Sequence, residues 1–342
     1  MKARNVKEEC MRRHEGQGCI DESTRVGFGS DGGLGKGILS RAAVSVAFAA
    51  LLTSCAGMVS NSGLPDRIVA ERGGFIPEGI EYDNNNRRLL TGSLAEGTVY
   101  AIGADGSMTP VVEDSALISS VGIEVDEARN RLLVANSDRS SDTGAARLGV
   151  YHLDSGDPIA MVDLVATIPD RPDDATHFAN DVAVSTAGVI YVTDTRMNIV
   201  YQVDTYYQGQ VFYDFGRNNN LNLNGIEYHP AGFLLVVSPG SGQLLRIPVN
   251  NPGRWDFVEL SEPAGGGDGI FWAADGTLAV VSNNSSRVLK YASDDNWRTA
   301  EVVDVAQFEG QATTGAAVGN DIYVVQPHFA DSDPPVILRA GF

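Results

Sequence analysis

Oxygen-bearing side chains stand at equivalent places in a motif that the chain repeats. The first copy is Pro77-Glu78-Gly79-Ile80, a leading residue followed by Gly-Ile or a near equivalent. The leading residues of the six copies are Glu78, Val121, Asn180, Asn224, Asp268 and Thr314. Two carboxylates and two amide carbonyls among them form a hard, oxygen-only ligand set that suits Ca²⁺. Zinc or copper would favour His or Cys, which none of these positions carries. The alternative is that Asn and Asp before Gly only form turns.

The spacing of the motif predicts the fold that positions these residues. The copies recur at intervals of about 44 residues, with one longer interval of about 59, and such periodicity is typical of repeat architectures. An apolar run follows each leader, as in Phe233–Ser238, and turn residues such as Asp83–Asn86 separate the two. Two further runs complete most units. Four short strands in each of six units predict an all-β, six-bladed β-propeller. Two packed β-sandwiches would explain neither the period nor the spare strands.

The ends of the repeat region predict how the ring closes. The last unit lacks a fourth strand, and Arg67-Ile68-Val69-Ala70 lies before the first leading motif. We expect this N-terminal strand to complete the last blade, which would remove the open edge of the ring. The propeller domain is therefore expected to span residues 66–342. Equivalent positions of successive blades converge on the central channel, so the four oxygen-bearing leaders should meet there.

The N-terminal segment, residues 1–54, is predicted to be a signal and targeting segment with an over-long start. The apolar run Ala42–Leu52 follows Arg41 and is too short to span a bilayer. Leu52-Thr53-Ser54-Cys55 resembles the lipobox of bacterial lipoproteins, which implies lipidation at Cys55. Residues 55–65 would then be a tether, and the protein would be extracytoplasmic, lipid-anchored to the bacterial envelope in the periplasm or at the cell surface. The alternative is a buried helix that happens to end in Cys.

Composition narrows the classes of partner. The 342 residues carry a formal net charge of −19, which argues against binding to nucleic acid or to an anionic membrane surface by charge. The three cysteines are Cys10, Cys19 and Cys55, so the body after them has no disulfide framework and no Cys-based zinc site. We expect a monomer that acts on a small molecule and meets the membrane only through its anchor.

Further residues are candidates for the walls of the pocket. Thr314 leads the sixth copy and could line the pocket or reach a metal-bound water, whereas Asp181 either supports Asn180 or caps a turn. His328 follows the second strand of the sixth unit, and His177 lies three residues before Asn180. Either histidine could face the site, and either could simply belong to a loop. Phe271 and Trp272 are interpreted as core.

The order Glu in Pro-Glu-Gly-Ile, then Asn180-Asp181, Asn224-Gly225 and Asp268-Gly269, resembles the senescence-marker-protein/gluconolactonase (SMP-30/gluconolactonase/LRE-like) family. That family belongs to the calcium-dependent six-bladed propeller hydrolases. The resemblance covers residues 70–340, and it implies that one catalytic Ca²⁺ is bound by Glu78, Asn180, Asn224 and Asp268. It also implies that Asp268 is the catalytic residue. Val121 and Thr314 depart from the ligand pattern in the second and sixth units.

The resemblance implies metal-dependent hydrolysis of lactones or related carboxylic esters, with phosphotriesters as a further class. Asp268 would either activate water or attack the substrate directly. Divalent cations other than Ca²⁺ remain open. The competing hypothesis is a non-catalytic, calcium-stabilised propeller that serves as an envelope binding or scaffold protein.

Overall fold

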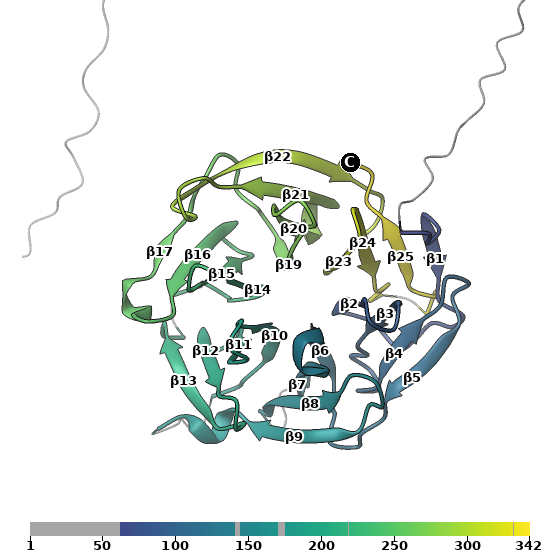
Figure 1. Cartoon of the computed structure of the whole chain (residues 1–342), viewed down its shortest axis with the longest axis horizontal. Coiled ribbons are helices and arrows are strands. Elements are labelled where there is room, and N and C mark those ends of the chain that lie inside the picture. Colours follow the sequence, from purple (N-terminus) through teal and green to yellow (C-terminus); the bar gives the residue numbers. More distant parts are fainter. Residues whose placement is uncertain (1–61, 141–143, 170–174, 218, 331) are drawn as a thin grey trace, which may run out of the picture. The chain divides into compact units, whose positions relative to one another are not determined.

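The computed structural model describes residues 62–140, 144–169, 175–217, 219–330 and 332–342. All of them belong to the compact unit Ala56–Phe342. Within these ranges, six sheets of short strands surround a central channel, as Figure 1 shows. The six-bladed all-β propeller predicted from the period of the motif is therefore confirmed. The predicted signal segment 1–54 and Cys55 lie outside the described residues.

Each blade runs outward from the channel in chain order. Blade 1 contains β2 (Ile80–Asp83), β3 (Arg88–Thr91), β4 (Val99–Ile102) and β5 (Met108–Val112). Blade 2 contains β6 (Ser120–Asp126), β7 (Arg131–Ser137), β8 (Ala146–His152) and β9 (Pro158–Asp163). Blade 3 contains β10 (Ala179–Val184), β11 (Ile190–Asp194), β12 (Ile199–Val203) and β13 (Gly209–Asp214). Blade 4 contains β14 (Ile226–His229), β15 (Phe233–Ser238), β16 (Gln243–Pro248) and β17 (Asp256–Phe257).

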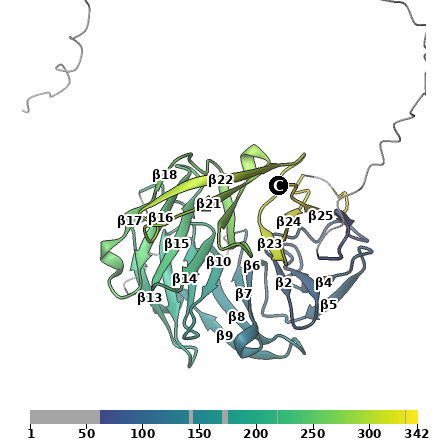
Figure 2. The same cartoon turned by 45° about the horizontal axis from the view of Figure 1, so that its top comes forward.

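The last two blades depart from this simple order. Blade 5 contains β19 (Gly267–Trp272), β20 (Leu278–Ser282), β21 (Arg287–Ala292) and β22 (Thr299–Gln307), with β18 (Glu259–Leu260) parallel to β22 at its outer edge. Blade 6 contains β23 (Gly315–Val318), β24 (Asp321–Gln326) and β25 (Val336–Arg339), and β1 (Arg67–Val69) pairs antiparallel with β25. The N-terminal strand thus closes the ring as predicted. β18 lies in the segment that connects blade 4 to blade 5. It pairs with the outer edge of the long strand β22 and covers part of it (Figure 2).

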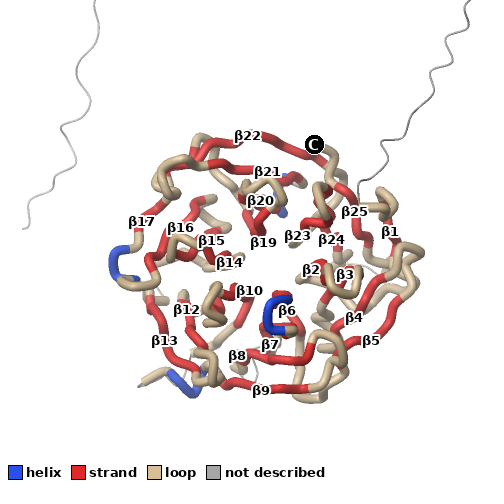
Figure 3. Tube along the Cα trace, viewed as in Figure 1, coloured by secondary structure: helices blue, strands red, loops and turns tan. Residues whose placement is uncertain are grey.

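Helical structure in the described residues is limited to single 3₁₀ turns, which Figure 3 shows in blue between the strands. They are η1 (Glu127–Arg129), η2 (Val165–Thr167), η3 (Pro252–Arg254) and η4 (Asn283–Ser285). None of the helices in this part of the chain is long and apolar enough to cross a membrane.

Apolar packing joins each blade to its neighbours. The buried apolar residues of the described chain form six clusters, and each cluster combines side chains from adjacent blades. The second strand of a blade is covered on both faces, so its central residues are a continuous apolar run rather than an alternating pattern. Every residue of β15 is buried. The blades are therefore held in the relative positions that bring their first strands around the channel.

The repeated glycine after each leading residue has a steric cause. The amide N–H of Gly225 donates to the Asp268 carbonyl of the next blade at 3.1 Å, and a Cβ on Gly225 would lie 2.6 Å from that oxygen. Gly79 makes the same approach to the Val121 carbonyl, with an N···O distance of 3.0 Å. Neighbouring blades thus touch backbone to backbone at the channel, and a side chain at these positions would push them apart.

Candidate metal centre

The predicted ligands lie where the first strands begin, at one end of the channel. Glu78 and Asn224 precede β2 and β14, whereas Asn180 and Asp268 lie inside β10 and β19. The pairing of β10 with β11 shifts register between Ala179 and Val182, and β19 has the corresponding irregularity between Gly267 and Ile270. Such bulges re-aim side chains next to functional sites. In blades 3 and 5 the shift contains a predicted ligand, and in blade 2 the same shift between Ser120 and Ile123 contains Val121.

The channel narrows to a small cavity that is lined by three of the four predicted ligands. Asp268 is not among the lining residues, although it accepts a hydrogen bond from Asn224. Glu78, Asn180 and Asn224 line the cavity together with Asp181 and Thr314, and its volume is 20 Å³. A space of this size holds about one water molecule, and hence about one monatomic ion. It is too small for an organic substrate, which would have to approach from the mouth.

Hydrogen bonds fix both asparagine side chains with their N–H groups turned to the protein. Asn224 Nδ2 donates to Asp268 Oδ1 at 2.8 Å, and Asn180 Nδ2 donates to Thr195 Oγ1 at 2.9 Å. No donor among the described residues occupies the carbonyl oxygen Oδ1 of either asparagine. The two amides therefore present the atoms that a hard cation would use.

Asp268 is held from two sides. Its Oδ2 atom accepts a hydrogen bond of 2.9 Å from Asn283 Nδ2, and its Oδ1 atom accepts the one from Asn224. Asn283 itself accepts a hydrogen bond from Gln311 Nε2. Asn283 directly follows the second strand of blade 5 and is the first residue of η4, and this position is equally consistent with a role in its own turn. The structure shows instead that it orients the carboxylate of Asp268.

The backbone of two other predicted ligands, Asn224 and Glu78, is fixed by threonines that the sequence did not single out. Thr193 Oγ1 donates to the Asn224 carbonyl at 2.8 Å, and Thr313 Oγ1 donates to the Glu78 carbonyl at 2.8 Å. Each threonine belongs to a neighbouring blade, so a contact between blades sets the direction of each ligand. Only the assembled ring reveals these partners.

Among the described residues, no basic side chain acts on the carboxylates in or beside the cavity. Burial raises the pKa of Glu78 well above its usual range, and Asp268 and Asp181 raise it further. Burial also raises the pKa of Asp268 to about 6, against the opposing hydrogen bonds from Asn283 and Asn224. The same cause raises the pKa of Asp181 to about 7. Charges arranged in this way favour a bound cation, because the cation would offset the burial and repulsion that now disfavour ionisation.

Two of the other pocket candidates line the cavity and two do not. Thr314 and Asp181 do, and Asp181 Oδ2 also accepts the Ile226 amide N–H of the next blade at 3.0 Å. In blade 3, Asp181 stands at the position of the repeated glycine. Its side chain therefore makes a hydrogen bond between blades at a place where the other motifs have only backbone. His328 is half-buried and has a positive φ of 54°. It is not among the residues that line the cavity.

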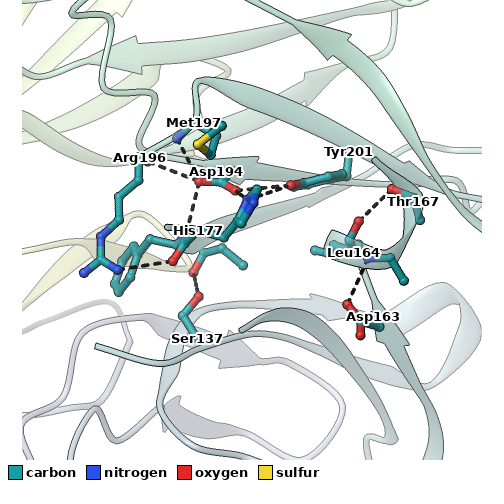
Figure 4. Close-up of polar contacts among 12 residues, drawn as sticks. Ser137, Asp163, Leu164, Thr167, His177, Asp194, Arg196, Met197 and Tyr201 are labelled. Carbon is teal, nitrogen blue, oxygen red and sulfur yellow. Dashed lines mark hydrogen bonds and ion pairs between the residues drawn. The ribbon is translucent and has the colours of Figure 1, made fainter. Parts of the chain in front are cut away.

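His177 lies away from the cavity, in the closed interior of blade 3 shown in Figure 4. It is 0% exposed, and its Nδ1 atom lies 2.6 Å from Asp194 Oδ2, which also accepts the Tyr201 hydroxyl at 3.2 Å. Asp194 Oδ1 accepts the Phe178 amide N–H at 3.0 Å. The His177–Asp194 pair therefore fixes the segment that leads into Asn180 and has no access to a substrate.

The donor set fits a calcium ion. Among the residues that the structure describes, no group of three or more His, Cys, Asp or Glu side chains is arranged to hold a metal. The predicted set is of a different kind, since it has two carboxylates and two amide oxygens. Glu78, Asn180 and Asn224 line the cavity with Thr314, and Asp268 joins the set through its hydrogen bond from Asn224. Val121 is buried and supplies only a backbone carbonyl, which Gly79 occupies.

Comparison with known proteins identifies the fold. No family model and no curated protein matches the sequence. Solved structures do match, among them the major Malassezia sympodialis allergen Mala s 1, at 17% identity and a TM-score of 0.64 over 81% of this chain and 96% of the other. Regucalcin from Agrobacterium tumefaciens, described as a calcium-binding protein, matches at 15% identity and a TM-score of 0.58 over 81% and 95%.

A gluconolactonase from Xanthomonas campestris matches at 16% identity and a TM-score of 0.54, over 81% of this chain and 88% of the other. The structural neighbours thus include a regucalcin and a gluconolactonase, which are the kinds of protein that the order of the motifs resembles. The resemblance seen in the sequence is confirmed to that extent. At these identities the likeness establishes the propeller fold. Function has to be argued from the site.

Proposed function

We propose that this protein is a metal-dependent hydrolase of lactones or related esters, and that the metal is Ca²⁺. The observation that carries the proposal is the ion-sized cavity lined by Glu78, Asn180 and Asn224, where both asparagines keep their amide N–H groups turned to the protein. The gluconolactonase and regucalcin neighbours share the fold and support the same class.

The roles of the residues follow from their contacts. The cation, when bound, would polarise the substrate carbonyl and stabilise the negative charge that develops on its oxygen. Asp268 would take a proton from the attacking water, or attack the substrate itself. Asn224 and Asn283 donate to its two oxygens, so they fix the orientation of the carboxylate and favour its ionised form.

The test is hydrolysis by the full chain, purified, stripped of metal and supplied with Ca²⁺. Lactones, aryl esters and organophosphates are assayed with and without chelator. We expect chelation to abolish turnover, Ca²⁺ to restore it, and Asp268→Asn to lower it by about 10²-fold or more. Asp154→Asn is the matched control, because Asp154 is exposed and hydrogen-bonds to Asn86 and Asn130 away from the cavity.

The second candidate is a calcium-stabilised propeller without catalysis. Of the three structures compared above, the one with the highest TM-score is described only as an allergen. The same fold therefore occurs in a protein for which no reaction is named. A folded, calcium-loaded sample that turns over none of these substrates would favour this candidate. Stoichiometric Zn²⁺ in the purified protein would overturn the assignment of the ligands.

For its location, we propose a lipid anchor at Cys55 that holds a monomeric propeller on the bacterial envelope, in the periplasm or at the cell surface. The supporting observation is the Leu52-Thr53-Ser54-Cys55 motif after an apolar run. Expression of the wild type and Cys55→Ala in a bacterial host tests this. The wild type should fractionate with membranes and carry an acyl mass on Cys55, and the variant should be released.

A further inference from the structure

The channel opens at its other end into a second, larger cavity. Its volume is 340 Å³, and it reaches the hairpin turns around Asn84 and Glu127. These turns follow the first strands, whereas the candidate metal ligands stand where those strands begin, so the two cavities lie at opposite ends of the channel. Glu81, Glu124 and Glu227 line both cavities and separate them.

These three glutamates come from equivalent positions of blades 1, 2 and 4, three residues after the leading residue of each motif. Burial raises the pKa of Glu81 to about 8, and it raises the pKa of Glu124 and of Glu227 well above the usual range. Each one is also raised by repulsion from other carboxylates. Their side chains are enclosed by protein, but they keep part of their surface accessible within the channel.

The carboxylates of this cavity lack a basic partner. No Lys or Arg is among the described residues that line it. No hydrogen bond or ion pair in the described parts of the chain involves the side chain of Glu124. An enclosed carboxylate without a donor is costly, so a cationic ligand would stabilise it.

The arrangement suits an organic cation better than a metal ion. The acidic side chains of the described residues are nowhere grouped in threes closely enough to hold a metal. The cavity is also many times larger than the one beside Glu78, and it has room for a small organic molecule. Carboxylates on the wall of a cavity this large suit an organic cation, whose apolar part would fill the rest of the space.

One wall of the cavity is apolar and aromatic. Trp272, Phe271 and Tyr82 line it beside Ala316 and Ala317. Trp272 is held by a hydrogen bond of 3.2 Å from its Nε1 atom to the Tyr228 carbonyl, and by an edge contact with Trp297 at 5.5 Å between ring centroids. It is only partly buried, although its place after the motif is typical of core. Burial raises the pKa of Glu227 and a hydrogen bond from Trp272 opposes that rise, so this aromatic side chain lies beside a carboxylate of the cavity. The face of an indole ring attracts quaternary and primary ammonium groups.

We propose that this second cavity is a binding site for a small organic ammonium ion, held by Glu81, Glu124 and Glu227 and packed against Trp272. The cavity lies apart from Asp268, and ligand binding there does not require that the protein hydrolyses anything. The bound ammonium ion and an ion at the other end of the channel would both offset the negative charge of the channel carboxylates.

The probe is choline, whose charge is permanent, and the neutral isostere 3,3-dimethylbutan-1-ol is its control. Both are titrated by calorimetry into the full chain with Ca²⁺ at saturating concentration. We expect saturable binding of choline and none of the alcohol. Trp272→Leu should weaken choline binding by about 5- to 30-fold, and Glu124→Gln should weaken it by about 10-fold.

Two further measurements make the outcome decisive. Glu124→Gln keeps the shape of the side chain and removes a repelled charge, so it should fold even where Trp272→Leu does not; thermal unfolding checks this. Glu113→Gln, at an exposed glutamate of blade 1, should bind choline as the wild type does. Equal behaviour of choline and the alcohol would overturn the proposal. So would loss of a bound Ca²⁺ in Glu124→Gln, because the site would then belong to a metal.

Discussion

The side-chain amide of Asn224 donates a hydrogen bond of 2.8 Å to Oδ1 of Asp268 in the next blade. The contact joins two predicted ligands of the same ion and uses the one part of Asn224 that cannot bind a cation. It also leaves the carbonyl oxygen of Asn224 without a donor among the described residues, and Asn224 lines the cavity. One hydrogen bond thus sets both the ligand and the base of the proposed reaction.

Asn224→Ala should weaken Ca²⁺ binding by about 10- to 100-fold, because it removes a ligand oxygen and the support of Asp268 together. Calorimetric titration of the metal-free chain measures this. Asn222→Ala is the control, since Asn222 is exposed two residues away. An Asn224→Ala protein that binds Ca²⁺ as tightly as the wild type would remove this residue from the site.

The pH dependence of hydrolysis should follow Asp268. In the absence of metal its pKa is about 6, raised by burial and lowered again by Asn283 and Asn224. The rate of hydrolysis should therefore rise with pH as Asp268 ionises. A bound cation should move this rising part of the pH–rate profile, its acid limb, to lower pH. Asn283→Ala removes a hydrogen bond that favours the ionised form, so its limb should shift to higher pH.

The check on this prediction is the profile of kcat/KM against pH for both proteins. Asn284→Ala serves as the matched variant, because Asn284 is the exposed neighbour of Asn283 in η4. If the limbs of wild type and Asn283→Ala coincide, the group that titrates is not Asp268.

Stability of the metal-free protein should fall as pH rises. Burial, followed by repulsion from Asp181, raises the pKa of Glu81 from its ordinary value of 4.5 to about 8. A carboxyl group that holds its proton more tightly in the folded state stabilises the fold below about pH 4.5 and loses this contribution as pH rises through about 8. We expect a lower Tm at about pH 8.5 than at about pH 5 in chelator.

Glu81→Gln should reduce this difference in Tm by at least about 2 °C, because the amide does not ionise. Differential scanning calorimetry of both proteins at the two pH values measures it. Glu113→Gln, at an exposed site, should keep the wild-type difference. If Glu81→Gln keeps the wild-type difference in Tm between the two pH values, the channel carboxylates do not control how stability depends on pH.

Closure of the ring by β1 should contribute measurably to stability. Ile68 is 1% exposed and packs in the cluster between blades 6 and 1, whereas its neighbour Val69 is 40% exposed. Ile68→Ala should lower the free energy of unfolding by about 2–5 kcal/mol, and Val69→Ala by about 0.5 kcal/mol or less. Equal effects in denaturant titrations would argue that β1 does not close the ring in solution.

Contact between blades at Gly225 should be intolerant of a side chain. A Cβ there would lie 2.6 Å from the Asp268 carbonyl oxygen, which is backbone and cannot move freely. Gly225→Ala should lower Tm and weaken Ca²⁺ binding together, since it displaces Asp268. Gly253→Ala should do neither, because a Cβ at that position meets nothing closer than 3.9 Å. A normal calcium titration for Gly225→Ala would contradict this.

The fold could be predicted because its signals are local and repeated. The apolar second strands, the turns between them and the glycine of each motif recur in every blade or nearly so, and Arg67–Ala70 was the spare strand that the last blade lacked. The convergence of Glu78, Asn180 and Asn224 followed from their shared position in the repeat. These features depend on spacing alone.

What could not be predicted depends on contacts between blades. Thr193 and Thr313 are ordinary strand-end residues until the ring places them beside a neighbouring ligand. His177 lies close to Asn180 in sequence, but its side chain turns into the blade toward Asp194. Trp272 was interpreted as core, and it does pack against the buried cluster of blades 4 and 5. Only the assembled channel shows that it also lines a cavity.

The most direct test is one titration, in which Ca²⁺ is added to the chelated full chain while lactone hydrolysis is recorded. We predict that turnover rises with the occupancy of a single site, and that Asp268→Asn stays inactive at every Ca²⁺ concentration. Turnover that is independent of Ca²⁺, or that survives in Asp268→Asn at the wild-type level, would contradict the proposed metal-dependent hydrolase.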